Sequence, residues 1–134
     1  MRPAAALCLA ALAVAGCGTA AQDSSEDFSG DERTVAAAVE RLETAARDDD
    51  AQKICASLLS DKLLGTLRRQ GTNCRTAVRE AISDADSFDL AVKEVDISGA
   101  VATVKVESGA GSERKDDALR LERDGGAWKI VSLG

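Results

Sequence analysis

The spacing of apolar residues changes once along this chain, at Ser87, and this change constrains the fold more than any other feature. From about residue 31 to Ser87 apolar residues recur every three or four positions, as in amphipathic helices. After it they alternate, as in strands with one buried face. Helices first and strands afterwards predict an α+β domain, with N-terminal helices packed on a bent antiparallel four-strand sheet.

Four helical segments are predicted before the change. The first spans about residues 31–48 and follows Ser29, which forms a capping-box pattern with Glu32. The others are residues 51–59, a segment from Ser60 to Gly71, and a segment that starts at Thr72 or Asn73. Their apolar faces are expected to cover the sheet.

The first predicted strand contains a phase change. Leu90 and Val92 alternate in one phase, whereas Val95 and Ile97 lie in the opposite phase. A β-bulge near Lys93 would bring both pairs to one face, so we expect a bent strand there.

The last predicted strand, residues 127–133, is apolar on both faces. Trp128 and Ile130 lie on one face, and Val131 and Leu133 lie on the other. A strand of this kind is expected to be central in the sheet or covered.

The chain begins with the layout of a secretory signal, one Arg followed by an apolar run from Ala4 to Ala15 that is too short to span a bilayer permanently. The residues at the end of this run, Val14-Ala15-Gly16-Cys17, resemble the lipobox of bacterial lipoproteins. That resemblance implies that Cys17 becomes the mature N-terminus, carries diacylglyceryl and acyl groups such as palmitate, and anchors the protein to the outer face of the cell membrane. An ordinary signal peptide, with Cys17 incidental, is the alternative.

This interpretation divides the chain into three parts. Residues 1–16 are the lipoprotein signal peptide, residues 17–30 are the lipidated Cys with an acidic tether, and residues 31–134 are the α+β domain. The tether is polar and acidic from Asp23 onward, so it cannot bury enough apolar surface to offset its ordering entropy. We therefore expect it to be flexible.

Cys55 and Cys74 are left once Cys8 departs with the signal and Cys17 takes lipid. Outside the cytoplasm such a pair is predicted to form a disulfide. A metal site or a redox pair is disfavoured because the chain has no His and these Cys lack Cys-x-x-Cys spacing. No metal and no other cofactor are expected.

The composition excludes several classes of function. The net charge is −6, and no basic patch with interleaved aromatic residues is present, which argues against a nucleic-acid partner. Without His or Tyr, a Ser-His-Asp site, a Cys-His site or a phenolic acid cannot be built from this chain alone.

The closing segment Leu-Glu-Arg-Asp-Gly-Gly-Ala-Trp-Lys-Ile-Val, residues 121–131, follows the helices and the bent sheet. This order resembles the NTF2-like superfamily of cone-shaped domains, which includes SnoaL-like and ketosteroid-isomerase-like proteins. Within it the chain is most similar to small actinobacterial lipoproteins, which carry a helical Ile-Cys segment and a second Cys before the sheet. The resemblance covers residues 31–134 and implies a cone with an inner face.

Enzymes of this superfamily place an Asp, Tyr or His inside the cone, whereas the inward phase of this sheet is apolar. The candidate pocket lining is Phe88, Leu90, Val92, Val104, Leu119 and Trp128. Trp128 could stack on a ligand, although a core position is favoured. Without the bulge, Glu94 or Asp96 would turn inward, and a buried carboxylate would support a ketosteroid-isomerase-type or SnoaL-type enzyme.

The sequence therefore favours a non-enzymatic, lipid-anchored binding or interaction module with no catalytic residue. Its expected partners are the membrane, through Cys17, and an unidentified protein or apolar small molecule. A structural accessory lipoprotein is the third class of function.

Overall fold

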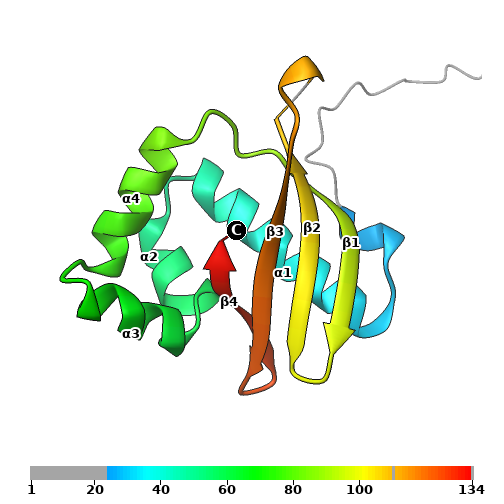
Figure 1. The fold of residues 1–134 in the computed structure, drawn as a ribbon, viewed down its shortest axis with the longest axis horizontal. Coiled ribbons are helices and arrows are strands. Elements are labelled where there is room, and N and C mark those ends of the chain that lie inside the picture. Colours follow the sequence, from blue (N-terminus) through cyan, green and yellow to red (C-terminus); the bar gives the residue numbers. More distant parts are fainter. Residues whose placement is uncertain (1–23, 110, 134) are drawn as a thin grey trace, which may run out of the picture.

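A four-stranded antiparallel sheet forms one layer of the molecule, with α1 crossing behind it and α2, α3 and α4 gathered beside β4 (Figure 1). The computed structural model describes residues 24–109 and 111–133. The elements, in chain order, are η1 (Ser24–Asp27), α1 (Gly30–Arg47), α2 (Ala51–Lys53), η2 (Ile54–Leu58), α3 (Asp61–Arg69), α4 (Cys74–Asp84), β1 (Leu90–Ser98), β2 (Val101–Ser108), η3 (Gly111–Glu113), β3 (Lys115–Asp124) and β4 (Ala127–Leu133). Here η1 and η3 are 3-10 turns, and η2 is a π-helix.

The predicted α+β class and the four-strand meander are confirmed. The strands lie in the order β1-β2-β3-β4, and each is antiparallel to the next. The core lies between the inner face of this sheet and the helices, and α1 supplies its largest helical part, namely Val35, Ala36, Ala38, Val39, Leu42 and Ala45.

The bulge predicted in the first strand is present in β1. The pairing register with β2 shifts between Val92 and Glu94, so Lys93 is the extra residue. Val92 and Val95 are consequently on one face and are only 6% and 8% exposed. The bulge bends the strand and keeps both phases of apolar residues in the core.

The last strand, β4, was expected to be either central in the sheet or covered, and it is not central. β4 is at the edge of the sheet, but the segment before α3 covers it: the Ser60 N–H donates to the Ile130 carbonyl at 2.9 Å, and Leu59 forms a parallel bridge with Ile130. A second register shift leaves Val131 without a partner and pairs Leu119 with Leu133. The phase change in this strand is therefore a bulge.

Part of the expected tether is folded. The backbone N–H and the hydroxyl of Ser25 donate to the Glu40 carboxylate at 2.6 and 2.8 Å, and the half-buried Phe28 packs against the core. Phe28 supplies the apolar contact that the rest of this acidic segment lacks, so residues 24–30 belong to the domain. The expected signal peptide and Cys17 lie outside the described residues.

The helix starts follow the sequence with one exception. The Ser60 hydroxyl accepts the Leu63 N–H at 3.1 Å, and the Asn73 side chain accepts the Thr76 N–H at 2.9 Å, as capping residues do. Ser29 occupies the N-cap of α1, but its side chain makes no capping hydrogen bond. The expected capping box with Glu32 is therefore not formed.

Candidate functional site

The six predicted lining residues are spread along the inner face of the sheet. Val92, Val104, Leu119 and Trp128 are buried, whereas Phe88 and Leu90 are half-buried. Leu90 pairs with Ser108 at one end of the sheet, and Trp128 pairs with Arg123 next to the β3–β4 turn at the other end. Trp128 is thus distant from Leu90 along the strands.

Helices α3 and α4 leave the apolar interior partly open. Seven residues of α1 are buried, but no residue of α3 or α4 is. Leu63, Leu64, Val78 and Ile82 pack against the core but remain partly exposed. The side of the core that α3 and α4 cover therefore keeps some apolar surface in contact with solvent.

The inner face also carries two charged side chains, at the end of the sheet where Leu90 pairs with Ser108. Asp117 pairs directly with Val106, and Lys115 pairs with Ser108. Directly opposite residues of an antiparallel pair share a face, so both charged side chains stand on the side of Val106, which is 2% exposed. Both are exposed. Neither was named from the sequence because neither side chain is apolar, although both occupy alternate positions that continue the inward phase of Leu119.

Glu94 and Asp96 do not lie in the interior. Both side chains are exposed, and the Lys105 ammonium donates to Glu94 at 2.9 Å. They line a shallow hollow together with Asp31 and Glu32. The enzymatic alternative needed one of these two carboxylates to be buried, and neither is.

A different carboxylate, Glu43 of α1, is buried with 5% of its surface exposed. Burial raises the pKa of Glu43, while the nearby Arg47 charge and the Leu90 backbone N–H oppose that shift. Arg47 lies 2.6 Å from the Glu43 carboxylate and also pairs with Asp89. These contacts fasten the start of β1 to α1. Sequence reasoning missed Glu43 because its neighbours on the helix are charged as well as apolar.

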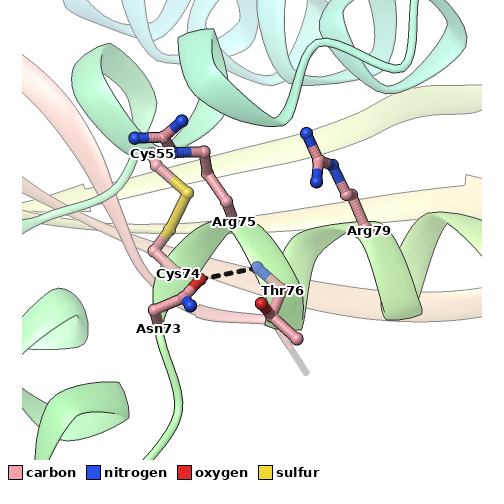
Figure 2. Close-up of a pocket in the computed structure, with 6 residues that line it drawn as sticks. All are labelled: Cys55, Asn73, Cys74, Arg75, Thr76 and Arg79. Atoms are coloured by element: carbon pink, nitrogen blue, oxygen red, sulfur yellow. Dashed lines mark hydrogen bonds between the residues drawn. A yellow bond between two sulfur atoms is a disulfide. The ribbon is translucent and has the colours of Figure 1, made fainter.

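The predicted disulfide is confirmed. Cys55 of η2 and Cys74, the first residue of α4, are bonded with a Cα–Cα distance of 6.0 Å, and both are half-buried (Figure 2). The bond connects α4 to the π-helix η2, and the residues that follow η2, Leu59 and Ser60, cover the edge of β4.

No helix in the described part of the chain is long and apolar enough to cross a membrane. Nor do three His, Cys, Asp or Glu side chains come together within residues 24–109 and 111–133 as a metal site would need.

Comparison with known proteins gives one family. The family model described as "Putative lumazine-binding" matches residues 33–133. No match is found among curated proteins. A de novo designed NTF2 fold protein, NT-9, is similar in structure with a TM-score of 0.49 and 19% sequence identity, over 78% of this chain and 85% of that chain.

Proposed function

Because this chain belongs to the family named for lumazine binding, we propose that it is a non-enzymatic module that binds a small apolar or aromatic molecule. The ligand lies between the inner face of the sheet and helices α3 and α4. Lumazine itself, a flat bicyclic heterocycle with polar edges, is the first ligand to test.

The observation that carries this proposal is the half-open interior beside α3 and α4. Val78 and Ile82 contact the core but are not buried. A ligand that covers such side chains removes apolar surface from water, which contributes about 25 cal/mol per Å². A small-molecule site also needs a few polar groups that fix orientation, and Asp117 and Lys115 stand on the same face.

The test is a titration of the full chain with lumazine and with Nile red, a neutral apolar dye. The Val78→Gln, Ile82→Gln double variant makes the half-open side polar, and Val101→Gln, at a half-buried position of β2 outside the core, is the matched control. We expect saturable binding by the wild type and the control and its loss in the double variant. Equal binding by all three proteins, or no binding of either compound, would refute the small-molecule function.

The second part of the proposal is the position of the module. Cys17 carries a lipid anchor and holds the domain at the outer face of the cell membrane. Support comes from the lipobox-like residues 14–17 and from the Cys55–Cys74 bond, which leaves Cys17 outside that pair. A diacylglyceryl group supplies the two chains that stable anchoring requires.

Fractionation of bacteria that express the full chain tests the anchor. The wild type and Cys8→Ala should be recovered in the membrane fraction, with the mass of a diacylglyceryl group on the mature N-terminus. Cys17→Ala should lose both the added mass and the membrane association. Recovery of Cys17→Ala in the membrane at the wild-type level would refute the anchor.

A further inference from the structure

Positive charge is concentrated in the helical part of an otherwise acidic chain. The segment from Ala51 to Asp84, which contains α2, η2, α3 and α4, has six Lys or Arg and three Asp or Glu, although the whole chain has a net charge of −6. An anionic molecule is therefore attracted to this side of the domain more than to any face of the sheet.

None of the four arginines of this segment has a carboxylate partner among the described residues, although Arg69 donates to the Thr66 hydroxyl at 2.9 Å. Arg68, Arg75 and Arg79 are exposed and make no ion pair, whereas Arg47, Arg114 and Arg123 each lie within 4 Å of a carboxylate oxygen. Figure 2 shows Arg75 and Arg79 extending from the same side of α4, with Arg75 alongside the disulfide. Their charges are thus available to a ligand.

The disulfide lies in two adjoining hollows between these arginines. One hollow has a volume of about 470 Å³ and the other about 400 Å³, and both include Cys55, Asn73, Cys74 and Arg75. The remaining lining residues are Thr76 and Arg79 in the first, and Gln52, Ala56, Leu64 and Arg68 in the second. Neither hollow is lined by Asp or Glu, so no carboxylate of the lining competes for the guanidinium groups.

The chemistry of this lining fits an oxyanion. A guanidinium group presents paired N–H donors that match two oxygens of a phosphate or carboxylate. The side-chain oxygen Oδ1 of Asn73 accepts the Thr76 backbone N–H, which leaves the side-chain N–H₂ of Asn73 as a further donor. The start of α4 at Cys74 adds the positive end of the helix dipole.

We propose that the surface around the Cys55–Cys74 disulfide binds a phosphate group, with Arg68, Arg75 and Arg79 as its cationic contacts. The disulfide, Ala56 and Leu64 provide an apolar floor for the part of the ligand next to the phosphate. This site shares Leu64 with the α3 side of the site proposed above, but its arginines and its disulfide are not part of that site, and it does not depend on the function proposed above. Its phosphate belongs either to a free phosphate ester or to a phospholipid headgroup.

Two binding measurements on the full chain distinguish these sources. The first is calorimetric titration with pyrophosphate and with phenyl phosphate. The second is binding to phosphatidylglycerol vesicles, with phosphatidylcholine vesicles as the neutral reference. The test variant is Arg75→Gln, Arg79→Gln. The matched control is Arg41→Gln, Arg120→Gln, which removes the same charge from two exposed arginines on α1 and β3.

We expect the test variant to bind at least about tenfold more weakly than the wild type, and the control to bind within about twofold of it. Loss in the soluble-phosphate arm identifies a phosphate ester, and loss only of the preference for phosphatidylglycerol identifies a lipid headgroup. Equal weakening in both variants, or no binding in either arm, would overturn the site. Retained thermal unfolding and the absence of free thiols confirm that each variant is folded, and unchanged lumazine binding separates this result from a failure of the proposed function.

Discussion

The guanidinium of Arg123 lies over the indole ring of Trp128, with its central carbon 4.8 Å from the ring centroid. The two residues pair directly across β3 and β4, next to the turn that joins these strands. Arg123 also donates to the Asp31 carboxylate at 3.0 Å. It therefore covers the exposed end of the core and links the β3–β4 hairpin to the start of α1.

Replacing Arg123 by Gln should lower the free energy of unfolding by about 1 kcal/mol, since a cation–π contact at an exposed site contributes about 0.5–1 kcal/mol. Trp128 is the single Trp of the chain, so tryptophan fluorescence reports on the surroundings of this ring alone. We expect a red shift in its emission because water gains access to the ring. The control, Arg120→Gln, changes an exposed position of the same strand, and an equal shift there would contradict the assignment.

Replacing both Cys55 and Cys74 by Ser should destabilise the domain by about 3 kcal/mol, because the bond closes a loop with a sequence separation of 19 residues. Urea denaturation under non-reducing conditions measures the difference. The reduced wild type should match the double variant. A variant as stable as the oxidised wild type would show that the bond does not constrain the unfolded chain.

The contribution of the buried Glu43 to the free energy of unfolding should decrease as pH rises. Its pKa is raised above the usual 4.5, so the folded state binds this proton more tightly than the unfolded state. The contribution of Glu43 to stability is therefore greatest below 4.5 and falls as pH rises through the folded pKa. Glu43→Gln removes this dependence while its side-chain oxygen can still accept the Leu90 N–H.

Urea denaturation of both proteins at pH values from about 4 to 7 tests this prediction. The unfolding free energy of Glu43→Gln relative to the wild type should increase with pH. Glu32→Gln, at an exposed position of the same helix, controls for the change in net charge. A difference that is independent of pH for Glu43→Gln would argue against a raised pKa.

Ser60 should be the most sensitive of the helix caps. Its buried hydroxyl accepts the Leu63 N–H, and Ser60→Ala leaves that N–H without a partner, at a cost of about 1 kcal/mol. Chemical denaturation of the variant measures the loss. Ser57→Ala, at an exposed position of η2, should have little effect, and a similar loss there would show that the cap is not responsible.

The two ends of the sheet show what a pattern of apolar residues can and cannot determine. In β1 the opposite phases of Val92 and Val95 indicate a bulge, and the structure contains it. In β4 the opposite phases of Ile130 and Leu133 arise from a bulge at Val131 as well, although we interpreted this segment as a central or covered strand. The sequence of one strand cannot distinguish a bulge from a strand that is apolar on both faces. The distinction depends on how that strand pairs with its neighbour.

The candidate site was harder to predict than the fold because it depends on what is left uncovered. Leu64 and Val78 are indistinguishable in sequence from core residues, and only their incomplete burial sets them apart. Arg68 is exposed, as a residue on a solvated helix face is, and the sequence does not indicate that it lacks a carboxylate partner. Net charge taken segment by segment, rather than over the whole chain, would have drawn attention to it.

The Cys55–Cys74 bond has a consequence for limited proteolysis. It encloses α3 completely, and neither α3 nor the loop after it contributes a buried residue, so this stretch should open more readily than the sheet. A protease that cleaves between Arg68 and Asn73 would leave both fragments covalently joined. Such a nicked molecule would migrate as an intact chain until a reductant separates it into two pieces, and it could retain its folded sheet throughout.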